Sequence, residues 1–148
     1  MTEVWFYHLE RHGPEQVLPE LLEKTLARGW RALVRAVAAE RIQRLDEWLW
    51  TYRDESFLPH GLAGEPQAGR QPILLTTEAE NLNAAQALFL MDGAELGEVE
   101  GYARCVVLFD GRDEAALVKA RSQWSQAKSR GYACSYWRQA ARGWEKQG

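Results

Sequence analysis

Apolar runs alternate with amphipathic stretches along the first half of this chain. The apolar runs at residues 4–9, 31–37 and 72–77 are predicted strands, and residues 15–28 and 39–52 are predicted helices. The strand residues are apolar in succession instead of alternating, which is typical of strands buried on both faces of a parallel sheet. Strand–helix–strand order then favours right-handed crossovers that place helices against that sheet.

The second half of the chain continues the alternation of apolar runs and amphipathic stretches, but the boundaries between them are less distinct. Strands are predicted at residues 87–91 and 101–110, and a helix at 113–130 that ends at Gly131. Residues 61–71 are expected to be irregular, and no element is assigned to the tail. A chain of 148 residues has the size of one domain. We therefore expect residues 1–148 to form a single Rossmann-like α/β domain of three layers, with a mostly parallel sheet of about five strands.

The net charge and the two cysteines limit the classes of function that this chain can have. The formal net charge is −3, whereas direct binding to nucleic acid needs a basic footprint. No apolar run is long enough to cross a membrane. Cys105 and Cys134 lack the spacing of metal ligands, and Cys105 lies in an apolar run that is typical of a core. We expect reduced thiols, a cytoplasmic location, and neither nucleic acid nor membrane as a direct partner.

A Rossmann-like fold raises the question of a nucleotide. The G-x-G-x-x-G turn that admits a pyrophosphate is missing after the first strand, and so is a P-loop anywhere in the chain. His8, Glu10 and His12 alternate as metal ligands on one strand face would, but Gly13 and Pro14 end the strand there. We expect no catalytic residue, no metal and no cofactor. The alternative is a small nucleotide-binding enzyme or sensor.

Residues 45–65 keep more apolar surface than the end of a helix needs. Trp50 lies about 120° from the centre of the buried stripe of its helix. Phe57, Leu58 and Pro59 follow in a loop, and His60 is expected to fix this loop through a hydrogen bond. Two interpretations remain open: either a partner protein covers these aromatics, or the loop buries them against its own domain.

The last predicted helix carries a column of cation, indole and cation. Arg121 stands three residues before Trp124, and Lys128 four residues after it. Such a column suits a ligand with both negative charge and an aromatic or apolar group, because arginine can chelate a carboxylate. The alternative is that Trp124 packs into the core while the two cations form a solvated face.

One succession of motifs resembles a known family. The strings LDExLW, SFLPH and LAGE, in this order and spacing, are similar to the chi subunit of bacterial DNA polymerase III holoenzyme. The resemblance extends to WFYHL near the start and to YWRQ and GWEK near the end. The matching residues are Leu45, Asp46, Glu47, Leu49, Trp50, Ser56, Phe57, Pro59, His60, Leu62, Ala63, Gly64 and Glu65.

The resemblance implies a non-catalytic adaptor in the clamp-loader complex of DNA replication. It implies that Trp50, Phe57, Leu58 and Pro59 contact the psi subunit. It also implies that Arg121, Trp124 and Lys128 hold the acidic C-terminal tail of single-stranded-DNA-binding protein, which ends in an aromatic residue with a free carboxylate. Ser125 departs from the family pattern, which often has a basic residue there; Lys128 would substitute for it. Trp137 and Trp144 also match family positions.

Overall fold

A parallel sheet with helices on both faces forms the framework of the molecule. The computed structural model describes residues 2–52, 58–140 and 143–147. Three α-helices are present in these ranges: α1 (Pro14–Ala27), α2 (Ala39–Thr51) and α3 (Glu114–Ser129). A 3₁₀ turn, η1, covers Ala68–Arg70. The strands are β1 (Glu3–Leu9), β2 (Ala32–Arg35), β3 (Gly61–Leu62), β4 (Ile73–Thr76), β5 (Ala87–Leu90), β6 (Arg104–Asp110), β7 (Ala133–Gln139) and β8 (Trp144–Lys146).

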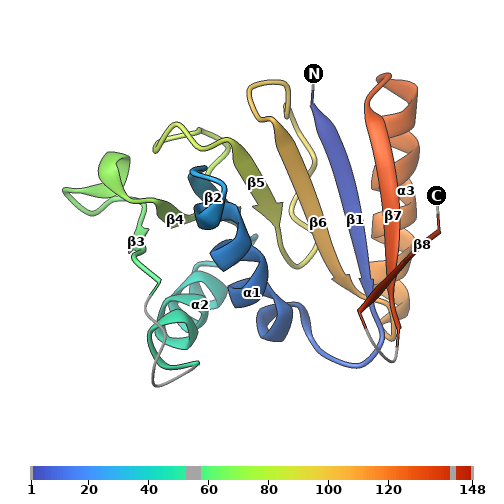
Figure 1. The fold of residues 1–148 in the computed structure, drawn as a ribbon, viewed down its shortest axis with the longest axis horizontal. Coiled ribbons are helices and arrows are strands. Elements are labelled where there is room, and N and C mark those ends of the chain that lie inside the picture. Colours follow the sequence, from blue (N-terminus) through green and yellow to red (C-terminus); the bar gives the residue numbers. More distant parts are fainter. Residues whose placement is uncertain (1, 53–57, 141–142, 148) are drawn as a thin grey trace.

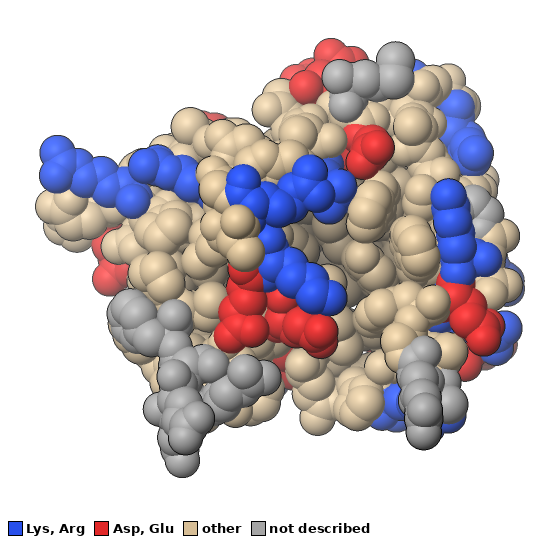
Figure 2. Space-filling model, in the orientation of Figure 1, with Lys and Arg blue, Asp and Glu red and all other residues tan. Residues whose placement is uncertain are grey.

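The strands make one sheet in the order β3-β4-β2-β5-β6-β1-β7-β8, counted over the described residues. Each neighbouring pair is parallel except β7–β8, which is antiparallel. In Figure 1, α1 and α2 cover one face of the sheet and α3 covers the other. The face seen in Figure 2 carries acidic and basic side chains in mixed clusters.

The predicted fold class is confirmed: three helices and five strands lie where the sequence places them, in three layers around a mostly parallel sheet. The sheet has three strands more than expected. Strand β3 lies in the segment expected to be irregular and has only two residues. Strands β7 and β8 lie in the tail. Strand β7 is half-buried and polar in part, because it pairs with β1 near the sheet edge, so it lacks a continuous apolar run.

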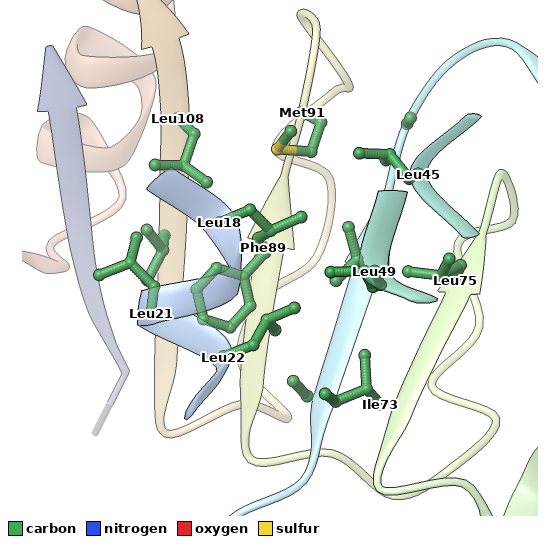
Figure 3. Packing of buried hydrophobic residues seen from close by; sticks show 14 of the residues in the cluster. Leu18, Leu21, Leu22, Leu45, Leu49, Ile73, Leu75, Phe89, Met91 and Leu108 are labelled. Carbon is green, nitrogen blue, oxygen red and sulfur yellow. The ribbon is translucent and has the colours of Figure 1, made fainter. Parts of the chain in front are cut away.

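Each face of the sheet has its own hydrophobic core. On one face Leu18 and Leu22 of α1 pack with Leu45 and Leu49 of α2 against strand residues such as Phe89 (Figure 3). On the other face, small side chains of α3, Ala120 and Ala127, allow close approach to a second cluster. Cys105 is fully buried in this second core, as predicted. Burial of both strand faces explains why β5 is apolar throughout and why β2 and β4 are apolar except at their last residues, Arg35 and Thr76.

No helix within the described ranges combines the length and the apolar character that crossing a membrane requires.

Candidate protein-interaction sites

Helix α3 presents the predicted column of Arg121, Trp124 and Lys128. Asp113 caps the start of the helix, because its carboxylate accepts hydrogen bonds from the backbone N–H groups of Ala115 and Ala116. Arg121 and Lys128 are exposed, and Trp124 is half-buried. The Lys128 ammonium lies 5.0 Å from the centre of the Trp124 ring, which is a cation–π contact. The structure therefore brings Lys128 and Trp124 together.

The indole of Trp124 also contacts the second core. Its ring lies edge-to-face with Phe6 at 5.3 Å and with Tyr136 at 5.7 Å between centroids. Both interpretations of Trp124 thus hold in part: one side of the ring packs inward, and the remainder stays accessible beside two cations.

A hollow of about 450 Å³ lies beside this column. Its lining consists of Arg121, Trp124 and Ser125 from α3, Tyr136 from β7, and Gln147 just after β8. The Gln147 N–H donates to the Tyr136 carbonyl at 2.7 Å, so the end of the chain closes one side of the hollow. We call this the α3 hollow. Lys128 lies over Trp124 outside its lining.

Tyr136 and Gln147 were missed as site residues because no element was predicted in the tail. The alternation of side chains between the two faces of the sheet along β7 explains the role of Tyr136. Tyr136 joins the core under α3, whereas its neighbour Trp137 points to the opposite face and packs on Trp5 at 5.8 Å. Trp144 likewise packs on Tyr7, at 4.7 Å. Trp137 and Trp144 therefore lie outside the α3 hollow.

Electrostatics make the α3 hollow receptive to an anion. The Tyr136 hydroxyl lies 2.6 Å from Nδ1 of His8. Burial lowers the pKa of His8. The positive charges of Arg138 and Arg121 also lower this pKa, whereas the negative charges of Glu10 and Asp110 raise it. Within the described residues, no carboxylate forms an ion pair with Arg121. The Arg121 guanidinium is thus available to an incoming carboxylate.

The side chains considered as metal ligands have protein partners instead. Strand β1 ends at Leu9, so strand alternation does not reach His12. Glu10 accepts from Arg138 at 2.6 and 2.8 Å, and Nδ1 of His12 lies 3.0 Å from the Gln139 amide. Across the part of the chain that the structure describes, no three His, Cys, Asp or Glu side chains form a group able to hold a metal ion.

The second candidate surface lies at the end of α2. Trp50 is 50 % exposed, and its ring lies 4.4 Å from that of His60. Pro59, which precedes His60 in the sequence, is half-buried. Phe57 lies outside the described residues. Leu58 was predicted as a contact on this surface, but only 3 % of it is exposed, because its side chain joins the core beneath α1 and α2.

His60 fixes this surface to α2. Its Nδ1 lies 2.6 Å from the Leu58 carbonyl oxygen, and its Nε2 lies 3.0 Å from a carboxylate oxygen of Asp46. The role expected for His60, holding the loop by a hydrogen bond, is confirmed. The carboxylate partner of His60 was not predicted, because Asp46 belongs to the preceding helix and reaches His60 only in the folded chain. We call Trp50 and Pro59 the α2 surface.

A larger crevice of about 840 Å³ opens between the N-terminal ends of α1 and α3. Folds of this kind bind nucleotides near the carboxyl ends of parallel strands. Several charged lining residues pair with one another here: Arg41 bonds Glu15 at 2.8 Å and Asp92 at 2.6 Å, and Arg112 bonds Asp110. The carboxylates in this lining would repel phosphate groups, which argues against the nucleotide-binding alternative.

Comparison with known proteins assigns this chain to a family. Residues 1–135 match the family described as "DNA polymerase III chi subunit, HolC". The chain is 26 % identical over 99 residues to the "Probable DNA polymerase III subunit chi" of Rickettsia prowazekii (strain Madrid E), an alignment covering 67 % of this chain and 60 % of that protein. It is 39 % identical over 59 residues to "DNA polymerase III subunit chi" of Escherichia coli (strain K12), covering 40 % of each. The alignments thus span less than two thirds of these two relatives.

A third relative, "DNA polymerase III subunit chi" of Pseudomonas aeruginosa, is 30 % identical over 95 residues, covering 54 % of this chain and 67 % of that protein. Among solved structures, the C-terminal domain of the DEAD-box protein Dbp5 superimposes with a TM-score of 0.51 at 13 % identity, covering 92 % of this chain and 90 % of that one. This likeness concerns the fold alone. The family match spans residues 1–135, which is most of the sequence, so the chain belongs to the chi subunit family of DNA polymerase III.

Proposed function

We propose that this chain is a non-catalytic adaptor in which residues 1–148 act as one rigid domain with two protein-binding surfaces. The α3 hollow would hold the acidic C-terminal tail of single-stranded-DNA-binding protein. The α2 surface, together with Phe57, would bind the psi subunit and through it the clamp loader. The observation that carries the proposal is the convergence of Arg121, Trp124 and Tyr136 on one hollow.

Chemistry explains why an acidic, aromatic-ended tail suits the α3 hollow. The Arg121 guanidinium can form two parallel hydrogen bonds with a carboxylate. The indole of Trp124 and the phenol of Tyr136 offer ring edges and faces to a terminal aromatic side chain. Lys128, outside the lining, would attract the acidic residues that precede it, and this attraction would weaken in salt.

The arrangement of the helices supports simultaneous binding. Helix α2 carries Trp50 on one face of the sheet, and α3 carries Trp124 on the other (Figure 1). Two partners can therefore dock without meeting at the same surface.

Calorimetric titration with an aspartate-rich peptide ending in Phe with a free carboxylate tests the first surface. Micromolar affinity corresponds to about 8 kcal/mol, and one anchor residue contributes roughly 2 kcal/mol, so Trp124→Ala and Arg121→Ala should each weaken binding about 30-fold. Val118→Ala removes an exposed side chain of the same helix and should bind like the wild type. Unchanged affinity in both site variants would exclude this site.

Co-purification with psi tests the second surface. Trp50→Ala should abolish recovery of psi while leaving the affinity for the peptide nearly intact, because Trp50 and Trp124 belong to helices on different faces of the sheet. Val37→Ala removes another exposed apolar side chain and should retain psi. If Trp50→Ala unfolds the isolated chain, Trp50 is a core residue and the surface assignment is wrong.

A further inference from the structure

A second group of cations and indoles lies on the opposite side of the sheet from the α3 hollow. It surrounds a cavity of about 390 Å³ between the end of α1 and strands β1 and β6. Three tryptophans line this cavity, namely Trp5, Trp30 and Trp144, and three cations accompany them, Lys24, Arg28 and Arg104. Trp5 and Trp144 belong to the WFYHL and GWEK motifs, but the proposed adaptor function gives none of these six residues a role. We call it the Trp30 cavity.

Guanidinium groups and indole rings alternate along one wall. The Arg28 guanidinium lies 4.3 Å from the centre of the Trp30 ring. The Arg104 guanidinium lies 5.3 Å from that ring and 3.8 Å from the ring of Trp5. Stacking of this kind holds the planar groups in fixed orientations and leaves their N–H edges for other acceptors.

Positive charge in this wall is only partly balanced. Glu3 is the carboxylate paired with Arg104 within the described residues, at 3.6 Å and with its own side chain half exposed. Burial lowers the pKa of Arg104, and the nearby charge of Arg28 lowers it further. The Nε of Arg104 is buried and has no hydrogen-bond partner in the part of the chain that is described. An anion near Arg28 and Arg104 would relieve their mutual repulsion.

Most of the remaining lining is apolar, apart from Thr25 and the Tyr7 hydroxyl. Leu21 of α1, Phe89 of β5 and Val106 of β6 form its floor. In Figure 2, basic side chains gather on this face between α1 and the beginning of β6, with acidic side chains below them. Lys24 pairs with Glu20 at 3.4 Å, but both side chains are about two-thirds exposed, so solvent weakens that pair. A suitable ligand thus combines carboxylates for the rim with one bulky apolar group for the floor.

We propose that the Trp30 cavity binds an acidic protein segment that carries one bulky apolar side chain. A single-stranded nucleic acid suits it less well, because a phosphate backbone needs a continuous basic track. Here the cations are confined to one wall, Glu3 and Glu20 flank them, and the chain carries a net charge of −3. A protein segment needs only one anchor and a few carboxylates.

Fluorescence anisotropy with a labelled probe peptide tests the proposal on the full chain. The probe has a central Phe flanked by three Asp or Glu residues on each side, with both ends blocked so that no free carboxyl terminus is present. Arg28→Glu should weaken binding at least tenfold, and Trp30→Ala should do the same. Arg44→Glu is the matched control, since Arg44 is an exposed arginine on α2, and it should bind like the wild type.

Two further measurements show which of the two sites binds the probe and which class of ligand the Trp30 cavity takes. Binding should survive Trp124→Ala, and a probe with Ala in place of Phe should bind at least tenfold more weakly. Equal affinity of Arg28→Glu and Arg44→Glu would overturn the proposal, and so would loss of binding in Trp124→Ala, which would place the probe in the α3 hollow. An oligothymidylate that binds more tightly than the probe, and that Arg28→Glu releases, would assign the cavity to nucleic acid instead. Because the blocked probe and the Phe-terminated tail are tested separately, failure here leaves the adaptor proposal intact.

Discussion

Trp124 shows how a single side chain can belong to a core and to a surface. Its ring packs edge-to-face with Phe6 and Tyr136, and its exposed part lies under Lys128. Packing on the inner side fixes the orientation of the indole before any ligand arrives, which lowers the entropic cost of binding. The same contacts explain why the position of Trp124 at the edge of its helical stripe predicted neither burial nor exposure alone.

His8 makes stability depend on pH in a predictable direction. Its pKa in the folded chain lies below the ordinary value of 6.5, chiefly because of burial. Below pH 6.5 the unfolded chain therefore binds more protons than the folded one, so the free energy of unfolding falls as the pH is lowered from 7 through 6.5. Urea denaturation at several pH values should show that His8→Gln loses less stability over this range than the wild type. Parallel curves for the two proteins would contradict the burial of a neutral His8.

The two cysteines should differ in reactivity. Complete burial raises the pKa of Cys105 to about 12, and the thiolate is the reactive form of cysteine. Cys134 is only half-buried, although burial also raises its pKa. Disulfide-exchange reagents should therefore label native Cys134→Ser hardly at all, and should label Cys105 once denaturant is added. Rapid labelling of native Cys134→Ser would mean that Cys105 is accessible.

At the scale of elements, the cap of α3 supports the site. Asp113 satisfies two N–H groups at the start of the helix, and its loss should cost about 1 kcal/mol of stability. Asp113→Ala should thus lower the melting temperature, while Asp113→Ser, which keeps a capping oxygen, should restore most of it. Because Arg121 and Trp124 lie about two and three turns further on, the affinity for the acidic peptide should change less than twofold. A large loss of peptide binding would show that the beginning of α3 shapes the hollow directly.

Elements differed in how well the sequence predicted them. Helices α1, α2 and α3 and the central strands were predictable because burial imposes a helical or continuous apolar pattern. Strand β7 was not, because it lies near the sheet edge, where Ser135, Arg138 and Gln139 are tolerated beside Trp137. The α3 hollow was therefore predicted only in part. Its residues on α3 were identified from helical spacing, whereas Tyr136 and Gln147 are brought to the hollow by β7 and β8, which were not predicted. Leu58 was misplaced because a loop residue can reach a core that only the tertiary fold creates.

At the scale of the whole molecule, the largest described crevice holds paired charges near the carboxyl ends of the strands, where folds of this kind can bind nucleotides. The crevice between α1 and α3 is lined by ion pairs among Arg41, Glu15 and Asp92. We therefore expect thermal melts with ATP, GTP or NAD to leave the melting temperature unchanged, because a ligand stabilises a protein only by binding its folded state. The acidic peptide, added at the same concentration, is the positive control. A specific upward shift with one nucleotide would favour the enzyme or sensor alternative.

The two proposed surfaces belong to helices on opposite faces of one sheet, and this separation is the core of the adaptor account. Each partner should bind as if the other were absent. The most direct test is calorimetric titration of the Phe-terminated acidic peptide into the chain alone and into its purified complex with psi. Independent binding of the two partners predicts one peptide site per chain with the same dissociation constant in both titrations. Displacement of psi by the peptide, or loss of peptide binding in the complex, would contradict it.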